Sequence, residues 1–299
     1  IESSEKKLKA GKDFAIGVCP ETANPGQIMN DFEKLPRLVG AIDEKTKNTI
    51  MKIYKHVFSV DLIEMPNCKT ANAVKLTTNV FRDLNIAFVN ELAILFEKVG
   101  IDIMTVLDAA KTKYNFQVHY PGAGVGGPCL PINSYQLLNT ARRTGSNLSI
   151  IESGRKINEK MPDHVTELTV NAFNECKKSI QNTSILILGI SYKPNVKDIQ
   201  LSPAAKIIKN FQNLEANVSI YDPYFISNEV YGIRVEKNLY EILPNMDAAV
   251  IVTGHDEFKK IDISSFSKMK TPILIDTRGI IDPTIAKKNK LVFRGLGRG

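Results

Sequence analysis

The 299-residue chain has no apolar run of membrane-spanning length, no signal-peptide pattern, no internal repeat and no low-complexity tract. Its four cysteines lie far apart without a Cys-x-x-Cys pair, which argues against a zinc site and a disulfide framework. Lysine and arginine are mixed with acidic residues and form no basic arm. We therefore expect a cytoplasmic protein with reduced thiols, no membrane contact, no metal site and no nucleic-acid partner.

What the sequence does contain is typical of a globular protein, with 43% hydrophobic and 24% charged residues. Its length predicts about two domains. The formal charge of +7 would suit nucleic acid, but a basic site for an anionic small molecule fits the scattered charges better. The chain starts at Ile1 and passes through a polar stretch into apolar residues 14–19, so we interpret it as an excerpt that begins inside a domain.

Residues 13–66 combine short apolar runs with one amphipathic segment, which indicates an α/β arrangement. We predict strands at 14–19, 37–40 and 60–64, and a helix that Asp43 caps and that ends near Phe58.

The middle of the chain is predicted to be helical. Residues 70–99 contain neither glycine nor proline, and apolar residues recur there at helical spacing up to Gly100. Further helices are expected at 101–118 and from 134 to about 176, with a break at Met161-Pro162-Asp163. A helix as long as the first suggests a dimer seam, although a helix buried within one subunit would give the same pattern.

The last part of the chain alternates strands with helices, which predicts a parallel, doubly wound sheet. One of its helices is expected to begin at Ser202-Pro203. Ligands of such sheets bind beyond the carboxyl ends of the strands, where Lys193 and Arg278 could bind phosphates or a uracil ring. His255 also follows a strand and is more often a loop histidine than a catalyst. The predicted strands are 184–189, 218–222, 247–253 and 272–276.

Gly122 to Gly127 has the G-x-G-x-x-G spacing of a dinucleotide fingerprint. The residues before it are a poor core strand, prolines follow it, and no acidic residue stands about twenty residues on. We therefore reject the fingerprint, which leaves two interpretations of these glycines: close approach to a ligand, or a tight connection.

Three further sites carry possible chemistry. Cys129 ends the glycine-rich loop, where the following helical run could stabilise a thiolate that attacks carbonyl carbons; the alternative is an inert, buried cysteine. Lys75 and Asn79 share one helix face and could hold an oxyanion, or be a solvated pair. Glu21 follows an apolar strand and could position water, act as a base or cap a turn.

Together these segments resemble the UDP-sugar 6-dehydrogenase family, which includes UDP-glucose and UDP-N-acetylhexosamine dehydrogenases. Each motif alone is weak, but the series in this order, from about Phe14 to Gly279, is specific. The motifs are Pro20-Glu21 with Pro25-Gly26, Lys75-Leu-x-x-Asn79, Asn90-Glu-Leu-Ala93, Pro121-Gly-x-Gly-Val-Gly-Gly127 with Cys129, Gly189-x-Ser-Tyr-Lys-Pro194, Ser202-Pro-Ala204, Tyr221-Asp-Pro223 and Asp276-Thr-Arg278.

The resemblance implies an oxidoreductase that uses NAD twice. Cys129 would add to the C6 aldehyde and pass through a thiohemiacetal and a thioester before water releases the uronate. Lys75 and Asn79 would stabilise the C6 oxygen, and Glu21 would take part in water and proton handling. Gly127 would lie at the cofactor. The residues implied to contact the UDP-sugar are Tyr120, Gly124, Gly126, Tyr192, Lys193 and Arg278.

The chain departs from the family pattern at two positions. Asn133 stands where the family usually has an aspartate, and an amide can orient water but cannot take its proton, so the hydrolytic step lacks its usual acceptor. Gln200 stands where an arginine commonly contacts the cofactor. The resemblance further implies that most of the amino-terminal NAD-binding part is absent, so that NAD binds poorly.

We thus predict an α/β protein with three regions: a Rossmann-like remnant at 1–66, a central helical dimerisation region with the cysteine loop at 67–160, and a UDP-sugar-binding α/β domain at 161–299. A homodimer or higher oligomer is expected. Pro25-Gly26 and the loop glycines favour the N-acetylhexosamine branch, with UDP-N-acetyl-D-mannosamine first. The alternatives are a UDP-glucose dehydrogenase and a non-catalytic fragment that binds UDP-sugars or dimerises.

Overall fold

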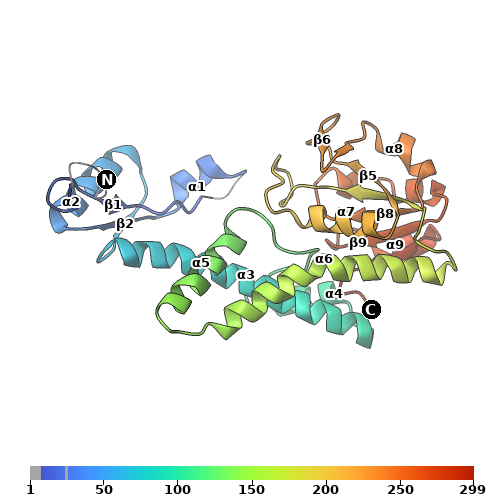
Figure 1. The fold of residues 1–299 in the computed structure, drawn as a ribbon, viewed down its shortest axis with the longest axis horizontal. Coiled ribbons are helices and arrows are strands. Elements are labelled where there is room, and N and C mark those ends of the chain that lie inside the picture. Colours follow the sequence, from blue (N-terminus) through green and yellow to red (C-terminus); the bar gives the residue numbers. More distant parts are fainter. Residues whose placement is uncertain (1–7, 24–25) are drawn as a thin grey trace. The chain divides into compact units, whose positions relative to one another are not determined.

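The computed structural model describes residues 8–23 and 26–299 (Figure 1). The chain divides into two compact units, Ile1–Phe81 and Arg82–Gly299. The start of the polar opening and Pro25 of the Pro25-Gly26 motif lie outside the described residues. Within the described ranges, no helix is long and apolar enough to cross a membrane.

The first unit contains a three-stranded sheet in the order β1-β2-β3. Its elements are β1 (Gly17–Val18), α1 (Ile28–Lys34), β2 (Arg37–Ala41), α2 (Glu44–Val57) and β3 (Leu62–Glu64). α2 connects the parallel strands β2 and β3, and the Asp43 carboxylate caps it by accepting the Thr46 amide at 2.7 Å, as predicted. The buried strand predicted at 14–19 is shorter: β1 has two residues, lies antiparallel at the sheet edge, and is bordered by an exposed Ile16.

Helices follow: α3 (Cys68–Val99), α4 (Ile103–Ala110), α5 (Leu130–Arg143) and α6 (Ser149–Glu175). α3 is the predicted long helix, and it ends at Gly100, whose φ of +73° suits glycine. The helix predicted at 101–118 already stops at Ala110. The break predicted at 161–163 is wrong, because α6 passes through Pro162 without interruption.

The glycine-rich loop packs against the turn of α6 that contains this proline. Pro162 has no N–H for the carbonyl of Asn158, four residues before it, so the helix lacks one hydrogen bond there. Gly124 of the glycine-rich loop lies against this same turn, and a Cβ on it would be 3.2 Å from the Asn158 carbonyl oxygen and 3.5 Å from Cδ of Pro162. The loop therefore packs on the turn that the proline alters, a contact that a local sequence pattern does not reveal.

The second unit contains the predicted doubly wound sheet, with five parallel strands in the order β10-β9-β8-β4-β5. Its strands are β4 (Ser184–Leu188), β5 (Asn217–Tyr221), β8 (Ala248–Ile251), β9 (Ile273–Asp276) and β10 (Val292–Gly295). The main helices are α7 (Pro203–Asn213), α8 (Leu239–Ile242) and α9 (Pro283–Lys288), and β6 (Glu229–Val230) pairs with β7 (Ile233–Arg234). β10 was not predicted, because its four residues have no clear apolar pattern.

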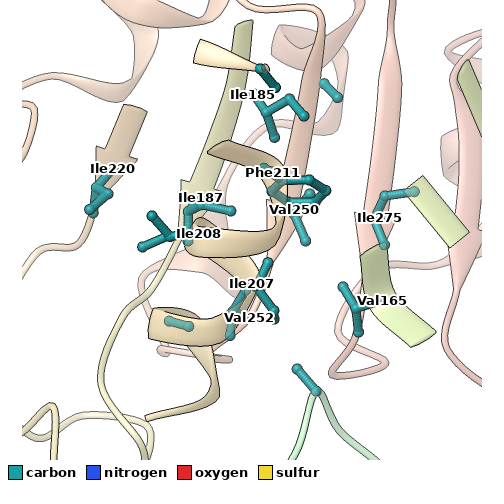
Figure 2. Close-up of a cluster of buried hydrophobic side chains, with 14 of the residues drawn as sticks. Val165, Ile185, Ile187, Ile207, Ile208, Phe211, Ile220, Val250, Val252 and Ile275 are labelled. Atoms are coloured by element: carbon teal, nitrogen blue, oxygen red, sulfur yellow. The ribbon is translucent and has the colours of Figure 1, made fainter. Parts of the chain in front are cut away.

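Alternating residues of β4 bury both faces of this sheet. Ile185 and Ile187 face the cluster that contains Ile207 and Phe211 of α7, and Figure 2 shows these side chains interleaved. The neighbouring leucines of β4 belong to the cluster on the other face, together with side chains of α8 and α9. Each such aliphatic side chain contributes roughly 1.5–3 kcal/mol to the stability of the folded protein when it is fully buried. The doubly wound arrangement thus follows from continuous apolar strands.

Strand order also locates the ligand edge. β4 lies between β5 and β8, so the chain leaves β4 on one side of the sheet order and returns on the other. Ligands of open parallel sheets bind at this switch point, beyond the carboxyl ends of the strands. The segments that begin there are residues 189–198 after β4 and 252–256 after β8.

Candidate active site

The glycine-rich loop, residues 120–129, packs onto the carboxyl edge of the five-stranded sheet. Arg278, which follows β9, places its Nη1 3.5 Å from the carbonyl oxygen of Pro121. A Cβ on Gly122 would come within 2.2 Å of the same Nη1, and the Gly127 amide donates to the Gln200 carbonyl at 2.9 Å. The loop is thus fixed to segments that follow two strands of the sheet.

The glycines allow this approach. A Cβ on Gly126 would lie 2.5 Å from the Leu201 carbonyl oxygen, and a Cβ on Gly127, where φ is +85°, would lie 2.7 Å from the Tyr192 ring. Gly124 also has a positive φ. The loop follows turns and irregular backbone at 111–121 rather than a strand, in agreement with our rejection of the dinucleotide fingerprint.

Cys129 lies at the end of this loop, exposed, as the residue that directly precedes α5. Its carbonyl accepts the Asn133 amide at 2.9 Å, which begins the helical ladder. Burial and then the Asp198 carboxylate raise the pKa of the Tyr192 phenol, and Cys129 is among the groups near this ring. The thiol therefore lies near Tyr192, at a helix N-terminus that favours negative charge.

The segment after β4 carries Tyr192 and Lys193, both half-buried, and is held by a buried histidine. The Asn195 amide donates to Nδ1 of His255 at 2.9 Å, so Nε2 carries the proton and donates to Asp222 at 3.2 Å. The Thr253 hydroxyl donates to the Ser191 carbonyl at 2.6 Å. His255 is thus the structural loop histidine that the sequence favoured, and it fixes the segment that carries two predicted site residues.

Arg278 is half-buried at the end of β9. Burial lowers the pKa of its guanidinium, while the Asp276 carboxylate acts in the opposite direction. The Arg278 amide donates to that carboxylate at 2.8 Å, which fixes the turn that presents the side chain. An arginine in this position stays charged and can bind phosphate oxygens in pairs.

The first unit brings a second group together around Glu21. Lys75 donates from Nζ to the Glu21 carbonyl oxygen at 2.5 Å. The Glu21 carboxylate accepts from the Ala23 amide at 2.6 Å and from Nη1 of Arg37 at 2.9 Å. Asn79 lies one turn beyond Lys75 on α3 and is half-buried. Arg37 was not among the site residues predicted from the sequence, because its only signal is a charge at the start of an otherwise apolar strand.

Arg37 and Glu21 form an ion pair with unequal exposure. The Arg37 side chain is buried, and its guanidinium stacks on the rings of Phe32 and Phe58 at 4.4 and 4.8 Å from their centroids. Burial raises the pKa of Glu21, but hydrogen bonds from Ala23 and Arg37 outweigh it and hold that pKa below its usual value. Glu21 therefore carries a negative charge at neutral pH, and Lys75 binds its backbone carbonyl rather than its carboxylate.

The remaining predicted residues lie in the second unit. The Asn133 side chain donates to Gln136 at 3.0 Å within α5, Gln200 is exposed beside the loop, and Tyr120 is exposed at the loop start. Two groups of residues result, one in each unit. The first contains Glu21, Lys75 and Asn79, and the second contains Tyr120, Gly124, Gly126, Gly127, Cys129, Asn133, Tyr192, Lys193, Gln200 and Arg278.

A doubly wound sheet with a structured carboxyl edge defines the class of α/β proteins that bind nucleotides there. The chain belongs to the UDP-glucose/GDP-mannose dehydrogenase family. Three of the family's models match it: the NAD binding domain at residues 1–58, the central domain at 69–160 and the UDP binding domain at 186–283. The expectation that most of the NAD-binding part is absent is therefore not confirmed.

Named relatives align with 90–98% of the chain. It is 36% identical to the UDP-N-acetyl-D-mannosamine dehydrogenase of Pyrococcus horikoshii, over 98% of this chain and 67% of that protein. It is 32% identical to the UDP-N-acetyl-D-glucosamine 6-dehydrogenase of Salmonella typhi, over 90% of this chain and 64% of that protein. The chain thus spans about two thirds of the length of these relatives.

Solved structures agree on the fold. The structure of UDP-D-ManNAc dehydrogenase from Pyrococcus horikoshii matches with a TM-score of 0.88 at 33% identity, covering 98% of this chain and 67% of that chain. The NDP-N-acetyl-D-galactosaminuronic acid dehydrogenase of Methanosarcina mazei matches with a TM-score of 0.89 at 30% identity, covering 98% and 65%. The α/β class with a helical centre and a parallel sheet is therefore confirmed.

Proposed function

We propose that this protein oxidises a UDP-N-acetylhexosamine at C6 to the uronate with NAD, and that UDP-N-acetyl-D-mannosamine is its substrate. The observation that carries the proposal is the exposed Cys129, at the end of a loop that Arg278 and Tyr192 contact on the nucleotide edge of the sheet. The names of the relatives in Pyrococcus and Salmonella support the N-acetylated substrate class.

When bound, NAD supplies the hydride acceptor for each of two oxidations. Between them, the Cys129 sulfur adds to the aldehyde carbon, and the aldehyde oxygen takes up a proton to give a thiohemiacetal. Loss of a hydride and a proton then leaves a thioester. Water adds to the thioester carbon, the carbon–sulfur bond breaks, and the uronate and the thiol are released. Each step places charge on the C6 oxygen.

Lys75 and Asn79 are proposed to stabilise that charge, because an ammonium held in place is already oriented when the charge develops. The hydrogen bond from Lys75 to the Glu21 backbone supplies this fixed position. Glu21, ionised beside Arg37, is proposed to orient water. Asn133 is proposed to orient the hydrolytic water without taking its proton.

NAD fits the first unit in one respect: β2, α2 and β3 form a parallel βαβ connection, the unit from which dinucleotide-binding folds are built. Gly127 and Gln200 are proposed to lie beside the cofactor. The proposed contacts to the UDP-sugar are Tyr120, Gly124, Gly126, Tyr192, Lys193 and Arg278. We retain 1–66, 67–160 and 161–299 as the proposed NAD-binding, central and UDP-sugar-binding regions.

We further propose a homodimer that works in the cytoplasm. α3 exposes an apolar stripe of Phe88, Leu95 and Val99, which are 51%, 51% and 56% exposed. Spacings of seven and four residues place these side chains on one helix face, the pattern of a helix–helix seam. A second copy of the stripe is the proposed partner, and the four free cysteines suit a reducing compartment.

The test measures NADH formed from NAD with UDP-N-acetyl-D-mannosamine, UDP-N-acetyl-D-glucosamine and UDP-glucose. We expect two NADH per UDP-N-acetyl-D-mannosamine, the highest kcat/KM for that sugar, and loss of turnover in Cys129→Ala. Cys176→Ala, which removes a half-buried thiol at the end of α6, is the matched control and should retain activity. Tight UDP binding without turnover of any UDP-sugar would instead support the non-catalytic alternative.

A further inference from the structure

A buried chain of hydrogen bonds links α3, α5 and α6 within the second unit. At its centre the Asp83 carboxylate accepts from Nη1 of Arg155 at 2.9 Å, from Nδ2 of Asn158 at 2.8 Å and from the Ser134 hydroxyl at 2.7 Å. Asn90 donates from Nδ2 to Oδ1 of Asn158 at 2.9 Å. All five side chains are buried.

This chain of hydrogen bonds reaches both ends of the glycine-rich loop, residues 120–129. At the loop start, the Gly122 amide donates to Oδ1 of Asn90 at 2.9 Å. Beyond the loop end, Ser134 lies five residues after Cys129 in the opening turns of α5, and its hydroxyl is bound by Asp83. The two anchors, Asp83 and Asn90, are seven residues apart on α3 and therefore share one helix face.

Each hydrogen bond of the chain has a fixed direction. Gly122 donates to Asn90, Asn90 donates to Asn158, and Asn158 donates to Asp83, whose charge the Arg155 guanidinium balances. A buried carboxylate is tolerated only when it is paired and hydrogen-bonded in this way, so loss of one donor disturbs the others. The chain of hydrogen bonds therefore acts as one polar unit.

We propose that Asp83 and Asn90 are positioning residues that hold the two ends of the glycine-rich loop, and so set the position of the Cys129 sulfur. The inference rests on the proposed function, in which that sulfur adds to C6. Thiol addition needs the reacting atoms at about 3–3.5 Å, and displacements on the order of 1 Å cost roughly a hundredfold in rate. The proposed UDP-sugar contacts Tyr192, Lys193 and Arg278 follow strands of the sheet and lie outside the loop, so UDP-sugar binding should change less than turnover.

The test uses Ser134→Ala, which removes one hydroxyl from the far end of the chain, and Asn90→Ala. Hydrogen exchange of the peptide that contains residues 120–129 reports on the loop without any need for turnover. We expect exchange of the Gly122 amide to be about tenfold faster in Asn90→Ala, the equivalent of one buried hydrogen bond. In Ser134→Ala, exchange of this amide should be measurably faster than in the unsubstituted protein. The kcat for NADH formation should fall at least tenfold, with the UDP-sugar KM within about threefold.

Thr169→Val is the matched control, because the buried Thr169 hydroxyl donates within α6 to the Val165 carbonyl and is not part of the chain of hydrogen bonds around Asp83. It should leave loop exchange and kcat unchanged. Unchanged loop exchange in Ser134→Ala would overturn the inference, even if Asn90→Ala does not fold. If the unsubstituted protein oxidises no UDP-sugar, the proposed function fails. Hydrogen exchange of residues 120–129 still decides whether the chain of hydrogen bonds holds the loop.

Discussion

At the scale of single residues, Glu21 shows how the structure refines a role that the sequence left open. Sequence alone allowed a base, a water ligand or a turn cap. The carboxylate accepts from Ala23 and Arg37, and these contacts hold its pKa below the usual value. A carboxylate that is reluctant to bind a proton is a weak base, so orientation of water suits it better.

The pH dependence of stability should carry this signature. Because the Glu21 pKa is depressed in the folded protein, the ion pair stabilises fully above the unfolded value of about 4.3, and that contribution is lost as pH falls through the lower folded pKa. Glu21→Gln removes this titration. The fall in Tm between pH 5 and pH 3 should therefore be smaller in Glu21→Gln than in the unsubstituted protein.

Glu91→Gln, at an exposed position of α3, serves as the control for this comparison. In Arg37→Met the buried stem can still pack on Phe32 and Phe58, and a carboxyl titration followed by NMR should place the Glu21 pKa higher than in the unsubstituted protein. An acid-side loss of Tm identical in Glu21→Gln and the unsubstituted protein would contradict the assigned ion pair.

At the scale of elements, the glycine-rich loop needs glycine where a side chain would collide with neighbouring segments. A Cβ on Gly127 would collide with the Tyr192 ring, and its φ of +85° is unfavourable for other residues. Gly145 has a similar φ of +72° but has nothing within 4 Å of its Cβ position. Comparing Gly127 with Gly145 separates the cost of a left-handed backbone from the cost of a steric collision, because only a Cβ at Gly127 would collide.

We expect Gly145→Ala to lower the free energy of unfolding by about 1–2 kcal/mol, the cost of a left-handed residue. Gly127→Ala should lower it by about 1–3 kcal/mol more, the cost of overpacking. In a Tyr192→Ala background, Gly127→Ala should cost only about as much as Gly145→Ala does in the unsubstituted protein. Urea unfolding of the unsubstituted protein and these variants measures the differences, and equal losses in Gly127→Ala and Gly145→Ala would disprove the collision.

The sequence predicted those elements whose cause is local. Periodicity gave α3 and the strands β4, β5, β8 and β9, and capping chemistry gave the starts of α2 and α7. It failed where distant segments decide: Pro162 is accommodated inside α6, and β10 pairs only because β9 is beside it. The same limit applies to the site, because the spacing of Asp83, Asn90 and Ser134 along the chain gives no sign that they share one hydrogen-bond chain.

At the scale of the whole molecule, the exposed stripe on α3 predicts self-association. Leu95→Glu places a charge in the middle of the stripe, and burying it without a partner would be costly. Light scattering should therefore give half the mass found for the unsubstituted protein. Ile285→Glu, at an exposed apolar position on α9, is the matched control and should keep the larger mass. A monomeric unsubstituted protein would refute the dimer.

The contact between Gly127 and Tyr192 also has an evolutionary consequence. Since a Cβ at 127 would lie 2.7 Å from the Tyr192 ring, a side chain at 127 is compatible only with a smaller residue at 192. Related sequences that carry a side chain at 127 should have a small residue at 192, whereas those with an aromatic ring at 192 should keep glycine. The two positions, 65 residues apart, would then be inherited as a pair.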